Sequence, residues 1–197
     1  GIAQRINSPA RSDDKRDSEV LLAIPDTLQG TLLARLDGLG ECKEFAQIAS
    51  VVGREFEIDV LLKLVSRPKE ELERGVETLV KSGLIRSSNA ATPSMFEFRH
   101  ALIREAAYNS LLRRDAVSLH LALARIYERD YPELRNSRPE MLAKHLTASG
   151  RLLDAASLWL QAGFSAKEIG STVEAMTRLD RCLECLESVG DLPEVQS

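Results

Sequence analysis

The sequence contains few cysteines and no long apolar run. Three cysteines in 197 residues cannot pair completely, which disfavours a disulfide scaffold and points to a reducing environment. The longest apolar stretches, such as residues 20–24, are far shorter than the roughly 20 residues that span a bilayer, and the first residues lack the apolar core of a signal peptide. We therefore predict a cytoplasmic protein that does not enter a membrane. Because the chain does not begin with Met, we expect a piece of a longer protein, unless processing removed the first residue.

An excess of positive charge is also missing. Lysine and arginine number 26 against 30 aspartates and glutamates, which gives a net charge of −4 and an isoelectric point of about 5.5. Proteins that bind nucleic acid or anionic membranes normally carry a basic excess. The composition therefore disfavours a dedicated nucleic-acid or membrane-surface binder.

No phosphate-binding loop is recognisable. The Gly38-Leu39-Gly40 turn lacks the Gly-Lys-Ser or Gly-Lys-Thr that such a loop requires, and the end of a helix explains its glycines better. Nor does the sequence contain a nucleophile paired with a base from which a reaction could be named. The chain is therefore predicted to be no enzyme and to hold no cofactor of its own.

The candidate metal ligands do not form a zinc motif. Cys182 and Cys185 are three residues apart inside a predicted helix, and a zinc site would need a second pair of ligands nearby. The three histidines, His100, His120 and His145, are scattered along the sequence. We therefore expect no metal, and we expect both cysteines to be buried as small apolar groups.

Apolar residues at helical spacing predict four helices in the first half of the chain. Leucines at 28, 32, 36 and 39 mark the first, which Gly38 and Gly40 end. The next three are expected at 41–52, 58–65 and 69–82. Residues 84–85 and 95–98 flank a polar loop and predict a β-hairpin, the one place in the chain where strands are expected. Three helices followed by a hairpin are typical of a winged helix.

From residue 100 onward the pattern is helical almost to the end. Helices are expected at 100–112, 116–130, 139–148, 152–169 and 172–188. The last two carry small residues such as Ala155 and Ala162 beside large ones such as Trp159 and Leu179, which is typical of tetratricopeptide repeats. The predicted fold class is mainly α: a winged helix with a small β-hairpin, followed by an antiparallel helical array of tetratricopeptide type.

One histidine stands where the second predicted strand turns into a helix. His100 follows Arg99 there, and the start of a helix leaves four backbone N–H groups unpaired at the positive end of the helix dipole. Such a position suits an anion, and the dipole favours a neutral imidazole that presents one N–H donor. The alternative is a structural histidine that satisfies a backbone carbonyl. The spacing alone leaves both interpretations open.

DNA binding is a further alternative, because the third helix of a winged-helix domain can enter a major groove. Residues 69–82 carry three basic side chains against four glutamates, and the hairpin adds only Arg86. Neutralisation of phosphates supplies most of the affinity for nucleic acid, so this surface is poorly suited to it.

Five blocks of the sequence, taken in order, resemble a known group of signalling proteins. They cover residues 24–37, 49–56, 96–112, 139–146 and 155–163. They are similar to the region that follows the ATPase module in bacterial proteins that join a class III adenylate/guanylate cyclase domain, an AAA-like STAND ATPase and tetratricopeptide repeats. Related ATPase-containing transcriptional regulators share this layout. The resemblance extends from residue 24 to residue 187.

This resemblance implies a regulatory role. In STAND ATPases the winged helix folds back on the nucleotide-binding domain and helps to hold ADP in a resting state. Plant and animal members use a Met-His-Asp motif whose His reaches the ADP phosphate. Arg99-His100-Ala101 occupies the matching place, although the flanking Met and Asp are absent. The implied phosphate-sensing residues are His100 and Arg99, and the implied cofactor is ATP or ADP with Mg on the preceding ATPase domain.

Three units follow from this interpretation. Residues 1–24 are predicted to be a linker or the end of the ATPase module, residues 25–112 a winged-helix domain with its linking helix, and residues 113–197 a helical arm with the first repeats. The predicted function is a regulatory fragment that closes on the ADP-bound ATPase domain and binds a protein partner through the repeats. A passive helical adaptor and a DNA-binding transcriptional regulator remain alternatives.

Large apolar residues near the end of the chain suggest a partner surface. Trp159 and Phe164 are expected to be core residues, although they could instead line a groove between repeats. Leu179, Leu183 and Leu186 are expected to form an exposed patch on the last helix, through which two copies of the chain contact each other.

Overall fold

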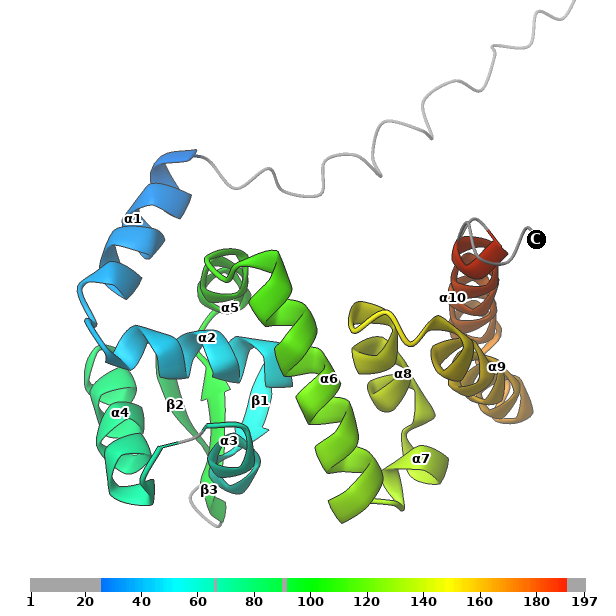
Figure 1. The fold of residues 1–197 in the computed structure, drawn as a ribbon, viewed down its shortest axis with the longest axis horizontal. Coiled ribbons are helices and arrows are strands. Elements are labelled where there is room, and N and C mark those ends of the chain that lie inside the picture. The colour runs from blue at the N-terminus through cyan, green and yellow to red at the C-terminus, as the bar shows by residue number, and fades with distance from the viewer. Residues whose placement is uncertain (1–25, 66, 90–91, 191–197) are drawn as a thin grey trace, which may run out of the picture.

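The computed structural model describes residues 26–65, 67–89 and 92–190. These residues are mainly helical, with ten helices and one small three-stranded antiparallel sheet (Figure 1). The linker predicted at 1–24 lies outside the described residues. No helix in the described ranges has the length and apolar character needed to cross a membrane.

The first part of the chain alternates helices with the three strands. Its elements are α1 (Asp26–Asp37), α2 (Cys42–Val52), β1 (Glu55–Glu57), α3 (Ile58–Leu64), α4 (Lys69–Lys81), β2 (Ile85–Asn89), β3 (Thr92–Phe98) and α5 (Ala101–Asn109). The four helices expected here are therefore confirmed. At the end of α4, Gly83 has a left-handed φ of 73°, and the N–H groups of Gly83 and Leu84 return to the carbonyls of Val80 and Leu79. Glycine adopts this conformation at low cost, and it turns the chain directly into β2.

The predicted hairpin is confirmed, since β2 and β3 pair antiparallel with Ile85 opposite Phe98. The expectation that strands occur nowhere else is wrong. Glu55–Glu57 forms β1, which pairs with the other edge of β3 and places Phe56 opposite Phe96. A strand of three residues is too short to show the alternation of apolar and polar residues that marks a strand in a sequence. Phe56 anchors it, because this ring is 2% exposed and lies against the rings of Phe96 and Phe98.

Helices α1–α5 and the sheet enclose one hydrophobic core. Phe45 of α2 is buried in it and lies so close to Gly75 of α4 that a Cβ atom at residue 75 would overlap the Phe45 ring. Helix α4 approaches α2 this closely because residue 75 has no side chain. Other fully buried members of this core are Leu36, Leu61, Leu72, Leu79, Leu84, Ile85 and Phe98.

The second part of the chain is helical throughout the described range. Its elements are α6 (Arg113–Asp130), α7 (Leu134–Ser137), α8 (Pro139–Ala148), α9 (Leu152–Glu168) and α10 (Thr172–Gly190). The long helices agree with those expected, although α6 begins at Arg113 rather than at residue 116. The short helix α7 was not expected, because four residues carry no recognisable period. In Figure 1, α6 runs between the sheet-containing part and helices α7–α10.

A second hydrophobic core lies among these helices. Leu123 of α6, Leu142 of α8 and Leu158 of α9 are fully buried in it. Val51 of α2 and Val60 of α3 also belong to this second core, so the two parts of the chain pack against each other.

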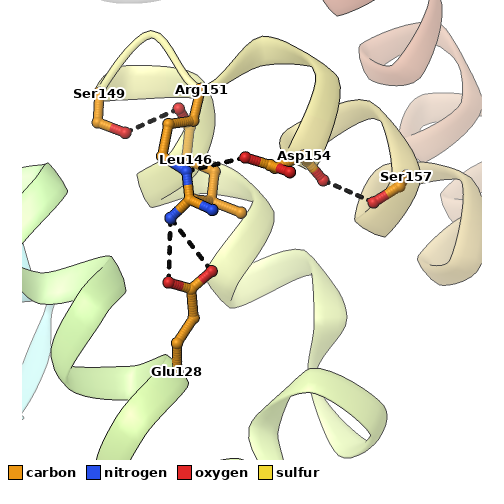
Figure 2. A network of polar contacts seen from close by, with 6 residues as sticks. All are labelled: Glu128, Leu146, Ser149, Arg151, Asp154 and Ser157. Carbon is orange, nitrogen blue, oxygen red and sulfur yellow. Dashed lines mark hydrogen bonds and ion pairs between the residues drawn. The ribbon is translucent and has the colours of Figure 1, made fainter.

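Arg151 connects α6 to the turn between α8 and α9 (Figure 2). Its Nη1 atom lies 3.2 and 3.0 Å from the two carboxylate oxygens of Glu128, and its Nε donates to Asp154 Oδ2 at 2.8 Å. The N–H of Arg151 and the hydroxyl of Ser149 both donate to the carbonyl of Leu146 at 2.9 Å. The turn is thereby fixed to the side of α6.

Candidate functional site

The two residues predicted to sense phosphate lie at the junction of β3 and α5. His100 is the residue immediately before α5 and has an extended backbone, with φ −138° and ψ 141°. Its side chain is exposed, caps no N–H of the helix and forms no hydrogen bond with a described residue. Arg99 is exposed as well. A structural histidine would have to donate to a backbone carbonyl. The ring of His100 donates to no backbone carbonyl among the described residues.

The backbone around His100 is held in place. The N–H of Arg99 donates to the carbonyl of Leu84 at 3.0 Å. One turn into α5, Arg104 donates to the carbonyl of Ser50 at 3.2 Å, which fixes α5 against α2. An exposed imidazole and an exposed guanidinium therefore stand side by side in sequence on a fixed backbone. The chemistry that this arrangement offers is donation of hydrogen bonds to an anion.

Two of the three basic side chains on α4 are paired with glutamates of the same helix. Lys69 and Glu73 lie 3.7 Å apart, and Lys81 and Glu77 lie 3.3 Å apart, each pair one turn apart on the helix. Just before the helix, Arg67 pairs with two further glutamates. A phosphate backbone would have to compete with these carboxylates, so the surface of α4 is poorly suited to DNA.

Two of the three histidines, although far apart in the sequence, meet in the structure. His120 of α6 and His145 of α8 are both buried, and their Nδ1 atoms lie 2.8 Å apart. The hydroxyl of Tyr108 at the end of α5 lies 2.9 Å from Nε2 of His120. The sequence separation of 25 residues hides this contact. The signal available was that each histidine occupies an apolar position of its helix, three residues from Leu123 and from Leu142 respectively.

Burial keeps both imidazoles neutral. It lowers the pKa of His145 to about 3, and protonation of His120, where it occurs, and the positive charge of Lys144 act in the same direction. Burial also lowers the pKa of His120, with a smaller effect from Arg104. One Nδ1 atom of the pair must donate and the other accept, so the tautomers of the two rings depend on each other. Where the hydroxyl of Tyr108 donates to Nε2 of His120, Nδ1 of His120 carries the proton that His145 accepts.

The described residues contain no group of three or more His, Cys, Asp or Glu placed to hold a metal ion. Cys182 and Cys185 of α10 are free thiols buried in the second core, with 6% and 2% exposure. Burial raises the pKa of Cys182, and Cys185 acts in the same direction. The expected role of both residues as small apolar groups agrees with this burial.

A groove lies between α8 and α10, next to α9. Two cavities of about 370 and 380 Å³ occupy it and share three lining residues, Lys144, Trp159 and Arg181. Trp159 is 6% exposed, and its indole N–H donates to Thr147 Oγ1 at 3.0 Å. It is therefore a core residue, as expected, and it also contributes to the wall of the groove. Lys144 is exposed and forms no ion pair with any residue that the structure describes.

Two of the other large residues of α9 and α10, Phe164 and Leu179, differ from what was expected of them. Phe164 is 54% exposed, so the expectation that it belongs to the core is wrong. Leu179 is half-buried, because it lies against Gly163 of α9. Leu183 and Leu186 are exposed, as expected. Contact between two copies of the chain through these residues stays a prediction.

No known protein family model and no solved structure matches this chain. One curated relative, an uncharacterized protein of Rhizobium meliloti, is 27% identical over 187 residues. The match covers 93% of this chain and 18% of the relative, so the chain spans about a fifth of the relative's length. The chain is thus similar to one region of a much longer protein, and the name of that protein states no function.

Proposed function

We propose that this chain is a non-catalytic regulatory region of a nucleotide-dependent signalling ATPase that is attached to an adenylate or guanylate cyclase. In this proposal, residues 25–112 close on the ADP-bound ATPase domain, and residues 113–197 bind a protein partner. The binding site for ATP or ADP with Mg is on the ATPase domain, and this chain only contacts the nucleotide bound there. The Rhizobium meliloti relative, of which the matched region is 18%, agrees with a module inside a larger protein.

The finer fold assignment is part of the same proposal. Helices α2, α3 and α4, the β2–β3 hairpin and the third strand β1 correspond to a winged helix. The tetratricopeptide pattern, Trp-x2-Leu-Gly-x2-Tyr followed by Ala-x3-Phe, has a counterpart in Trp159-x2-Ala162-Gly163 and Ala175-x3-Leu179. A Cβ atom on Gly163 would lie 2.8 Å from the side chain of Leu179, so this glycine stands where α9 and α10 touch. This close contact supports an arm of tetratricopeptide type.

The observation that carries the nucleotide-sensing part is the exposed His100 at the start of α5, next to Arg99. A structural histidine at this position would be expected to bond a neighbouring group, and this ring bonds none of the described residues. In the closed state, the ring and the first N–H groups of α5 donate to a phosphate oxygen of ADP on the ATPase domain. Exchange of ADP for ATP favours an open arrangement and frees the arm for its partner.

Magnitudes limit what His100 does alone. A hydrogen bond to a charged group contributes about 1.5–3 kcal/mol. A nearly complete shift between two states needs a difference of about 5.5 kcal/mol in ligand affinity. His100 therefore supplies part of this difference, and Arg99 with the helix-start N–H groups supplies more of it.

The test uses the chain extended to include its preceding ATPase domain. His100→Ala is expected to speed the dissociation of a fluorescent ADP about tenfold, because about 1.4 kcal/mol corresponds to a factor of ten. It is also expected to raise the basal signalling activity of the protein, because the ADP-bound resting state is less populated. Arg113→Ala, at an exposed position in α6, is the matched control and should leave both quantities unchanged. An ADP dissociation rate that is the same in His100→Ala and in the natural sequence would count against phosphate sensing.

The same extended protein separates this proposal from the passive adaptor. A regulatory module contacts the ATPase domain more strongly in ADP than in ATP, and cross-linking yields should differ accordingly. An adaptor gives equal yields with ADP, with ATP and without nucleotide.

A further inference from the structure

Exposed apolar residues concentrate at one end of the molecule, where Figure 1 places α9 and α10. Twelve large apolar side chains among the described residues are exposed, and eight of them lie in α9, in α10 and in the turn between them. Apolar residues clustered in this way mark an interaction site, whereas residues scattered singly do not. Ile169 lies in the turn, and Val173 of α10 lines the groove described above. The other six are Leu153, Leu160 and Phe164 on α9, and Met176, Leu183 and Leu186 on α10.

The spacing of these six residues places them on one strip, which we call the α9–α10 strip. They are seven and four residues apart on α9 and seven and three residues apart on α10, which puts each row on a single helical face. The two helices touch where Leu179 lies against Gly163. Leu160 and Phe164 flank Gly163 in sequence, and Met176 and Leu183 flank Leu179, so both rows border the same line of contact.

The strip lies on the side of α10 that faces away from the groove. Arg181 lines the groove, and Leu183 is about 160° around the helix axis from it, since an α-helix turns about 100° per residue. On the groove side, Glu174 pairs with Arg178 at 3.3 Å and Glu184 pairs with Arg181 at 2.8 Å. The charged residues that α10 contributes to the groove are therefore paired within α10 itself.

The charges that border the strip are different. Asp180 follows Met176 by one turn, Glu187 follows Leu183 by one turn, and both carboxylates are exposed. Glu168, at the end of α9, is a third exposed carboxylate one turn after Phe164, next to the single cation Lys167. None of these four side chains forms an ion pair or a hydrogen bond with another residue in the described ranges. The apolar strip thus has a mainly acidic border that is open to a partner.

We propose that the α9–α10 strip binds an amphipathic helix from outside residues 1–197, with an apolar stripe and with lysine or arginine on both sides of that stripe. The apolar stripe covers the exposed leucines, and the basic side chains pair with Asp180, Glu187 and Glu168. A second copy of this chain is a poor occupant, because a two-fold contact through the strip brings its acidic borders together. This docking surface rests on the partner-binding part of the proposed function, and on residues 1–197 alone, without the ATPase domain, it is expected to bind without nucleotide.

Two peptides of about 18 residues, or about five helical turns, test the proposal on the whole chain. Both have leucine at heptad positions a and d; one has lysine beside the leucines and the other has glutamate. By fluorescence anisotropy, the lysine peptide is expected to bind about tenfold more tightly at low salt, and the preference should shrink as salt screens the charges. Asp180→Asn combined with Glu187→Gln should remove most of the preference.

Matched substitutions separate the strip from the rest of the surface. Leu183→Asp should abolish binding of the lysine peptide, whereas Leu112→Asp, at a leucine that is 59% exposed outside the strip, should leave it intact. Equal affinity for the two peptides, or binding that survives Leu183→Asp, overturns the proposal. A dimer in sedimentation that Leu183→Asp dissolves also overturns the proposal, because the occupant is then a second copy. A gain in peptide affinity when residues 1–25 are deleted overturns it as well, because the occupant is then the chain's own segment. No nucleotide is present, so these failures are distinct from failure of phosphate sensing.

Discussion

Lowering the pH is predicted to destabilise the helical arm through the buried pair of His120 and His145. In the folded protein, the pKa of His145 is lowered from 6.5 to about 3, and that of His120 is lowered as well. Below about pH 6.5 the unfolded chain therefore binds protons that the folded chain does not bind, and the free energy of unfolding falls with the pH. This contribution is fully present above the unfolded pKa and is lost progressively below it.

The size of the effect follows from the shift of His145. One pKa unit corresponds to about 1.36 kcal/mol, and pH 5 lies about 1.5 units below 6.5, so His145 alone removes about 2 kcal/mol between pH 7.5 and pH 5. His120 acts in the same direction. Asp130, whose pKa is lowered from 3.8, titrates below this range, since its hydrogen bonds with Arg129 and Lys63 favour the carboxylate.

Urea unfolding at both pH values, followed by the fluorescence of Trp159, measures this loss. Trp159 is the single tryptophan and is buried beside α8, so its emission reports on the arm that holds the pair. In His145→Asn, an amide stands near the position of Nδ1 but does not titrate, and the stability difference between the two pH values should shrink by about 2 kcal/mol. His100→Asn, at an exposed histidine, is the matched control. The reasoning is refuted if His145→Asn and the natural sequence lose the same stability between pH 7.5 and pH 5.

Two further predictions concern packing and the α6 connection. Gly75→Ala should lower the free energy of unfolding by about 1–3 kcal/mol, because the new methyl group overlaps the buried ring of Phe45. Gly30→Ala, where nothing lies within 4 Å, should instead stabilise α1 by up to about 1 kcal/mol. A double-mutant cycle of Arg151→Ala and Glu128→Gln should give a coupling of about 0.5–1 kcal/mol, since both side chains are about a third exposed. Equal stabilities of Gly75→Ala and Gly30→Ala would contradict the packing argument. A coupling near zero between Arg151 and Glu128 would contradict the connection to α6.

The parts of the fold that follow local rules were predictable. Periods of three and four residues located the long helices, and the two apolar runs around a polar loop located the hairpin. Strand β1 depends instead on a partner about 40 residues away, because Phe56 lies opposite Phe96 and its own three residues carry no pattern. The close contact of Gly75 with Phe45 is likewise invisible until α2 and α4 are packed together.

The candidate sites divide in the same way. The position of His100 before a helix was predictable, since the end of the strand and the start of the apolar period both mark it. The pairing of His120 with His145 was not, because a histidine at an apolar position shows burial but not its partner. The exposure of Phe164 was missed for the opposite reason: its spacing fits a core face, and only the arrangement of α9 and α10 leaves that face uncovered.

Helix α5 connects the two halves of the proposed function. Its first turn follows the exposed histidine, and Tyr108 in its last turn starts the hydrogen-bonded path through His120 to His145 in α8. Each of these bonds contributes about 0.5–1.5 kcal/mol, so the path orients α5 relative to α8 but falls short of the roughly 5.5 kcal/mol that switches a state. The larger share of any coupling must therefore come from packing, above all from Val51 and Val60, which reach from α2 and α3 into the core of the arm. If the first part of the chain moves as a rigid unit when it closes on the ATPase domain, Val51 and Val60 move with it. Because these two residues are packed in the core of the arm, the arm then moves as well.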